Sequence, residues 1–129
     1  MRAAEEEGAR PPAPARPPPP QRTLIAEGSQ GNILPASQGA GYFLVVTVSG
    51  NGALEATVDW TSASNQIGIA WAQGDCTTSS NCTPLEENVG PAKPKTLRVS
   101  NVPAGNYTLV IVNFGTTTES ISFQLFLVH

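Results

Sequence analysis

Two cysteines, Cys76 and Cys82, are the residues of this chain whose type and spacing point most directly to chemistry. Their spacing is wider than the C-x-x-C pattern typical of redox and metal sites. The lone histidine, His129, is the last residue, so a zinc site of the Cys/His kind would need acidic ligands as well. We therefore predict a disulfide between the two cysteines, which closes a short loop and indicates an oxidising compartment.

Catalytic groups are hard to assemble from the remaining residues. A serine or cysteine nucleophile needs a neighbouring base, and one terminal histidine does not supply a Ser-His-Asp triad. Asp59, Asp75, Glu86 and Glu87 could form a carboxylate pair for glycoside hydrolysis or, with Asn88, part of a calcium site. However, Asp59 falls on the polar face of its strand, the two glutamates lie in a loop, and no D-x-D-x-D pattern occurs. We predict a protein that is not an enzyme and has neither a metal nor a cofactor.

Aromatic side chains offer an alternative, a stacking platform for sugars. Tyr42, Trp60 and Trp71 could form it if they were exposed. Both tryptophans are in phase with apolar neighbours on their strands, which favours packing in the core. Tyr107 follows a turn and is expected to satisfy its hydroxyl on the backbone at a corner of the fold.

The elements that position these residues are predicted to be strands. Pro103 presets φ in a tight turn and Gly105 tolerates a positive φ, so 97–112 is predicted to be strand, turn, strand. Period-two alternation and turn residues predict further strands. The predicted strands span 42–48, 54–60, 66–72, 96–101, 107–114 and 121–128. We predict an all-β fold, a single antiparallel β-sandwich of the jelly-roll or immunoglobulin-like kind.

Three other segments complete the domain. We expect a short extended piece at 23–26, a loop around 28–31, and a loop of unusual length at 73–95. Two strands leave alternatives open. The small residues of 66–72 predict either close packing by another element or a flat exposed strip. The part of the last strand at 123–128 is apolar on both faces, so it is either central in its sheet or covered by a partner.

Composition divides the chain near residue 22. Residues 1–22 hold seven of the twelve prolines and four of the seven basic residues, whereas 23–129 carry a net charge of about −4. We therefore predict a Pro-rich arm or linker at 1–22 and one sandwich domain at 23–129. Three scattered cations in the domain argue against nucleic-acid binding. No run reaches transmembrane length, and 1–7 lack the apolar core of a signal peptide, so an export signal is expected to lie outside this sequence.

The arm contains four consecutive prolines, which favour polyproline II. One interpretation is a disordered spacer. The other is a docking arm that contacts a protein partner, for which the candidate residues are Pro17, Pro18, Pro19, Pro20 and Arg22.

The domain resembles the bacterial pre-peptidase C-terminal (PPC) family over about residues 40–128. The closing signature of the family, Pro-Ala-Gly-x-Tyr, is matched by 103–107. The looser matches are Tyr-Phe-Leu-Val-Val at 42–46, Leu-Glu-Ala-Thr-Val-Asp-Trp at 54–60 and the segment 65–70. Where such domains carry acidic residues for calcium, this chain has Asn65, Gln66 and Gly68. The resemblance implies a secreted sandwich that accompanies a catalytic domain and is not itself the enzyme.

Two functional hypotheses follow. The first is a non-catalytic structural or accessory subunit of an extracytoplasmic assembly, secreted, at the cell surface or periplasmic. Its Pro-rich arm and apolar strands would contact protein partners or further copies of the chain. The second is a secreted carbohydrate-binding or adhesion module that binds polysaccharide through the 73–95 loop or an aromatic face.

Overall fold

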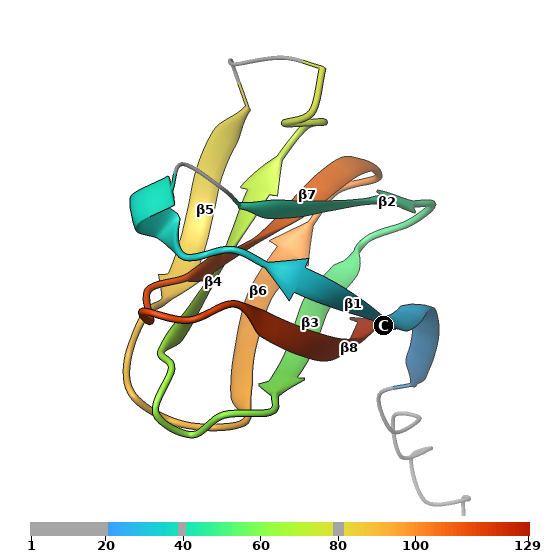
Figure 1. Cartoon of the computed structure of the whole chain (residues 1–129). Helices are drawn as coiled ribbons and strands as arrows, with labels where there is room; N and C mark the ends of the chain where they lie inside the picture. Colours follow the sequence, from blue (N-terminus) through green and yellow to red (C-terminus); the bar gives the residue numbers. More distant parts are fainter. Residues whose placement is uncertain (1–20, 39–40, 79–81) are drawn as a thin grey trace, which may run out of the picture.

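A computed structural model describes residues 21–38, 41–78 and 82–129 (Figure 1). These described residues are almost entirely β, with eight strands and one short 3₁₀ turn, Ala36–Gln38. The strands are β1 (Arg22–Ile33), β2 (Tyr42–Val48), β3 (Gly52–Trp60), β4 (Ile67–Gln73), β5 (Thr83–Asn88), β6 (Lys95–Val102), β7 (Gly105–Asn113) and β8 (Glu119–Val128).

The strands form two antiparallel four-stranded sheets that pack face to face as a sandwich. One sheet has the order β1-β8-β3-β6 and the other the order β2-β7-β4-β5. First pairs with last, second with seventh, third with sixth and fourth with fifth, as in a long hairpin folded over on itself. This is the order of a jelly roll, so the predicted antiparallel β-sandwich is confirmed and its topology is the jelly-roll one.

The core lies between the sheets and follows the period-two alternation of the strands. Along β3, Leu54, Ala56 and Val58 are fully buried, while the residues between them face outward. Both tryptophans belong to this core, with Trp60 5% and Trp71 0% exposed. The Trp71 indole donates a hydrogen bond across the sandwich to the carbonyl of Leu97 at 3.3 Å. Trp71 therefore joins the two sheets, and neither tryptophan forms a surface platform.

The prediction of a loop around 28–31 is wrong, because these residues belong to the first strand. β1 runs unbroken for 12 residues, and Gly28 pairs with Phe123 of β8. A Cβ at Gly28 would lie 3.1 Å from the Phe123 ring, so the glycine leaves room for that ring. Two register shifts, between Leu24 and Ala26 and between Gln30 and Ile33, accommodate the irregular sequence. A glycine-rich composition therefore belongs here to a bulged edge strand rather than to a loop.

The prediction of one long loop at 73–95 is wrong, because the fifth strand lies within it. β5 pairs with β4, Pro84 lying opposite Ala72 and Glu87 opposite Ala70. Proline is tolerated because β5 is an edge strand, where one side of the backbone needs no ladder partner. Leu85 packs against the core and supplies the apolar anchor. The loop is therefore two shorter connections around a strand.

The predicted disulfide between Cys76 and Cys82 is present, with the two Cα atoms 5.4 Å apart. It closes the connection between β4 and β5. Thr108 of β7 fastens the base of this connection: its hydroxyl donates to Gly74 O at 2.7 Å and accepts from the Cys76 amide at 3.0 Å. The connection is thus held by a covalent bond and by the neighbouring strand.

The sheet begins one residue earlier than the expected boundary at residue 23. Arg22 opens β1 opposite Val128, forms an ion pair with Glu55 at 2.8 Å, and lies 4.0 Å from the centroid of the Phe126 ring. Gln21 and His129 exchange two backbone hydrogen bonds, of 2.8 and 2.9 Å. The other arm candidates, Pro17 to Pro20, lie outside the described residues.

Candidate functional site

The two outer faces of the sandwich differ in chemistry, and each is a candidate site. On one sheet, β1-β8-β3-β6, the outward side chains are mostly polar. On the other, β2-β7-β4-β5, they are mostly apolar. Because the inward residues fill the core, the alternate outward residues are the ones that each sheet offers to a ligand or a partner on its outer face.

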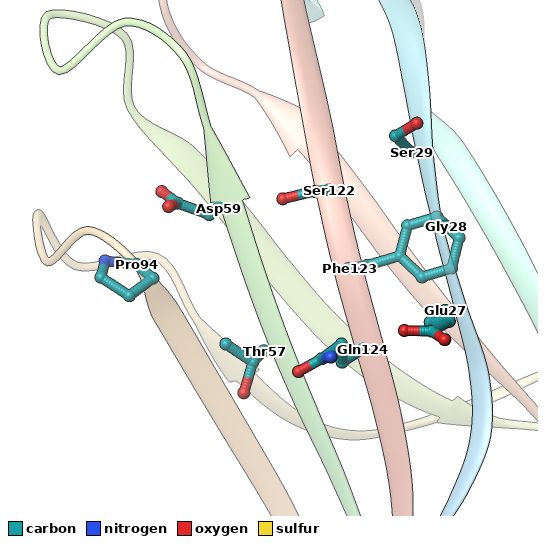
Figure 2. Close-up of a pocket in the computed structure, with 9 residues that line it drawn as sticks. All are labelled: Glu27, Gly28, Ser29, Thr57, Asp59, Pro94, Ser122, Phe123 and Gln124. Atoms are coloured by element: carbon teal, nitrogen blue, oxygen red, sulfur yellow. The ribbon is translucent and has the colours of Figure 1, made fainter.

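The polar face contains a hollow of about 490 Å³, which we call the polar hollow (Figure 2). Strand register builds it from two transverse rows. Glu27, Gln124 and Thr57 form one row across β1, β8 and β3, and Ser29, Ser122 and Asp59 form the next. Pro94, Gly28 and the ring of Phe123 complete its lining.

Asp59 is held as a carboxylate at one wall of the polar hollow. It accepts a hydrogen bond from the Lys93 ammonium at 2.8 Å and another from the Trp60 amide at 2.9 Å. The Lys93 contact first, and the Trp60 amide second, lower the pKa of Asp59 below its usual range. A general acid for glycoside cleavage needs the opposite shift. The hollow therefore offers hydrogen bonds but no proton donor at Asp59.

Stacking contacts are scarce in the polar hollow. Figure 2 shows the Phe123 ring directed at Gly28, and the residue is 8% exposed. Glu27 lies on the opposite side of β8 from Asp59. The arrangement can bind hydroxyl groups through its carboxylate, amide and hydroxyl side chains, with little aromatic surface beneath them.

The other outer face carries most of the large exposed apolar side chains of the described residues, and we call it the apolar face. The exposed fraction is 41% for Phe43, 38% for Val45, 44% for Val89 and 51% for Phe114. Half-buried Ala70, Val110 and Val112 lie between them on β4 and β7. Phe114 and Val89 cover Gly68, where an added Cβ would lie 2.5 Å from the Phe114 ring. Of the two alternatives left open for 66–72, the structure shows close packing: Gly68 and Ala72 are buried and Ala70 is half-buried, so no flat exposed strip runs along β4.

Glu119 was not among the residues predicted from the sequence to be buried or functional. It is almost fully buried, at 2% exposure. It accepts hydrogen bonds from the Thr61 amide at 3.0 Å, the Ser62 amide at 3.2 Å and the Asn65 side chain at 2.7 Å. Burial alone would raise the pKa of Glu119, but hydrogen bonds from the Thr61 hydroxyl, the Asn65 side chain and the amides of Ser120 and Thr61 lower it to about 2. The carboxylate ties the β3–β4 connection to the start of β8. Its role is structural.

Lys95 is a second buried charge that was missed. It points inward at the start of β6 with no exposed surface, and its ammonium contacts Gly90 O and lies 5.9 Å from the Trp60 ring centroid. Burial lowers the pKa of Lys95. Alternation in the sequence could have predicted the burial of both residues, because Lys95 is in phase with Leu97 and Val99, and Glu119 is in phase with Ile121.

The residues expected at the β6–β7 turn lie together at one corner. Gly105 has a φ of +149°, which disfavours other residues, and the Tyr107 hydroxyl donates to Pro103 O at 2.6 Å. His129 lies beside Thr23, with 2.9 Å between Nε2 and Oγ1. Across the described part of the chain, no three His, Cys, Asp or Glu side chains gather as they would around a metal ion. Asn65, at the position compared with calcium-binding PPC domains, belongs instead to the Glu119 contacts.

In the same described ranges no helix is long and apolar enough to span a bilayer. The disulfide is typical of an extracytoplasmic environment.

No protein-family model and no curated protein matches this sequence. Solved structures do match the fold. One is the crystal structure of the Yersinia pseudotuberculosis-derived mitogen (YPM), with a TM-score of 0.55 over 85% of this chain and 87% of that chain. The two sequences are 14% identical, so the similarity shows a common β-sandwich fold alone.

Proposed function

We propose that this chain is a non-catalytic structural or accessory subunit of an extracytoplasmic protein assembly, in which a protein partner covers the apolar face. The observation that carries the proposal is the exposure of Phe43, Val45, Val89 and Phe114 on one outer face of the sandwich. Contiguous apolar surface of this kind marks protein interaction sites more often than isolated exposed residues do.

The disulfide and the resemblance to PPC domains support the placement of this assembly outside the cytoplasm. An accessory domain of that family accompanies a catalytic domain, which agrees with the lowered pKa of Asp59 in the polar hollow. The Pro-rich arm, 1–20, is proposed as a further contact or as the spacer that holds the domain away from a surface.

The polar hollow favours a second candidate, a carbohydrate-binding module. Its hydroxyl, amide and carboxylate side chains fit sugar hydroxyl groups, and its open shape fits a chain rather than a small molecule. This candidate ranks second because the hollow exposes so little of the Phe123 ring, whereas sugar faces are usually bound by aromatic stacking.

One experiment separates the two candidates. The native mass is measured for the whole chain, for a chain without residues 1–20, and for Phe114→Lys, and each protein is passed over insoluble polysaccharides. The deletion ends at residue 20 because Gln21 and Arg22 belong to the sheet.

A subunit is expected to run as part of a larger species that Phe114→Lys weakens, and to pass through the polysaccharides unretained. Retention of a monomer on a polysaccharide, lost in Gln124→Ala and kept in Phe114→Lys, would contradict the subunit proposal and support the second candidate. Loss of the larger species on deletion of 1–20 would identify the arm as a contact.

A further inference from the structure

The four edge strands of the sandwich differ in how they discourage pairing with other chains. Edge strands present a free row of backbone N–H and C=O groups, and proteins guard them with bulges, prolines or charges. β1 has two register shifts. β5 contains Pro84 and two glutamates. β6 contains Arg98 and the inward-pointing Lys95.

β2 has none of these devices. Its sequence, Tyr-Phe-Leu-Val-Val-Thr-Val, has no charge, no proline and no glycine. It pairs with β7 at seven successive positions without a register shift. Within the described ranges β7 is its one ladder partner, so the other edge of β2 is free.

We propose that the β2 edge pairs with the β2 edge of a second copy of this chain, antiparallel and about a two-fold axis, so that the β2-β7-β4-β5 sheet continues across the dimer. The inference deepens the proposed function, on which it rests, by naming one partner of the apolar side of the sandwich.

A second copy is the occupant that the chemistry favours. Two uncharged strands meet without like-charge repulsion, and a two-fold arrangement of one strand with itself closes, so no filament forms. The Pro-rich arm is a poor occupant, because its prolines have no N–H to donate to the ladder. Pairing of β2 with β5 or β6 of another copy would meet the proline and charges of those strands.

Side chains beside this edge agree with the pairing. Phe43 and Val45 are 41% and 38% exposed and stand on the outer face of β2. In an antiparallel pair these side chains adjoin those of the second copy on the same face. The dimer would thus bury apolar surface as well as satisfy backbone groups.

The experiment measures the mass of the purified chain over a range of concentrations by sedimentation, with Val45→Lys as the test variant and Val89→Lys as its matched control. Both residues are exposed valines on the apolar face, but only Val45 lies on β2. We expect a concentration-dependent dimer for the wild-type chain and for Val89→Lys, and a monomer for Val45→Lys. A mixture of Val45→Lys and Val45→Glu should dimerise again, because the paired charges are opposite.

Hydrogen exchange of the wild-type chain provides a check that needs no substitution. The free-edge amides of 42–48 should become protected as the concentration rises, while those of β5 and β6 at the other edges should not. A wild-type chain that stays monomeric at every concentration, or a Val45→Lys chain that dimerises as the wild type does, overturns the inference. If the monomer still joins a larger species that Phe114→Lys weakens, the proposed function stands although the inference has failed.

Discussion

Glu119 and Lys95 are both buried ionisable residues, but the surroundings of Glu119 favour its charged form and those of Lys95 disfavour it. The glutamate is surrounded by donors, so its charged form is favoured in spite of burial. The lysine has one carbonyl contact and an aromatic ring nearby, and its charged form is disfavoured. Removing each charge should therefore have opposite effects on stability.

Replacing Glu119 by Gln should lower the free energy of unfolding at neutral pH by on the order of 3 kcal/mol, since a pKa of about 2 rather than 4.5 corresponds to about that much. The folded pKa is the lower one, so this stability is present above pH 4.5 and is lost as the pH falls toward 2. Urea unfolding at several pH values measures it.

The matched control for this substitution is Glu27→Gln, at an exposed position of β1, which should unfold as the wild type does. The prediction fails if Glu119→Gln is as stable as the wild type at pH 7 and loses stability at low pH in the same way. That result would show that the hydrogen bonds do not depend on the charge.

Replacing Lys95 by Met should leave the protein as stable or more stable at neutral pH, by about 1 kcal/mol, because a buried ammonium gives way to an apolar side chain of similar length. In the wild type the folded pKa is lowered below 10.5, so the unfolded state binds more protons in the window between the two values, and stability rises with pH there.

The advantage of Lys95→Met should therefore shrink as the pH approaches 10.5. Thermal melts of both proteins across this range measure the difference, and Lys93→Met at the surface serves as the control. A large loss of stability in Lys95→Met at every pH would instead show that the Gly90 contact dominates.

Strands with regular alternation could be predicted from the sequence, whereas the irregular edge strands β1 and β5 could not. Trp60 and Trp71 share the phase of their apolar neighbours, so alternation alone predicts that they lie in the core. β1 and β5 were not predicted as full strands because their stability comes from tertiary contacts. Gly28 fits against Phe123, and Leu85 inserts into the core. The residue types at such positions suit the element that packs against them, and the sequence of the strand itself does not reveal which element that is.

The β4–β5 connection allows the disulfide to be tested apart from the fold. Replacing both Cys76 and Cys82 by Ala should lower the free energy of unfolding by about 2 kcal/mol, since the closed loop is short. The fold should persist, because Thr108 still holds Gly74 and residue 76 to β7.

Denaturation of the wild-type and double-alanine chains, each with and without a reductant, measures this effect. Reductant should destabilise the wild type to the level of the variant and leave the variant unchanged. A variant that is unfolded at room temperature would mean that the connection depends on the disulfide more than its loop length implies.

At the scale of the molecule, the sandwich was predictable and the order of its strands was not. Short alternating segments fit several antiparallel topologies, and local patterns do not distinguish them. The jelly-roll order depends on pairings such as Arg22 with Val128, more than a hundred positions apart. The same holds for the candidate sites, because the apolar face and the polar hollow each combine residues from several strands.

The pairing of Gln21 with His129 has a mechanical consequence. Both ends of the domain leave at adjacent positions of one sheet, held by two backbone hydrogen bonds. A force that pulls these ends apart acts across the β1–β8 ladder and loads its hydrogen bonds one after another, like opening a zipper. A force applied along the strands would load many bonds at once. If this domain is tethered at both ends, it yields readily to tension, first by detaching β1 from β8.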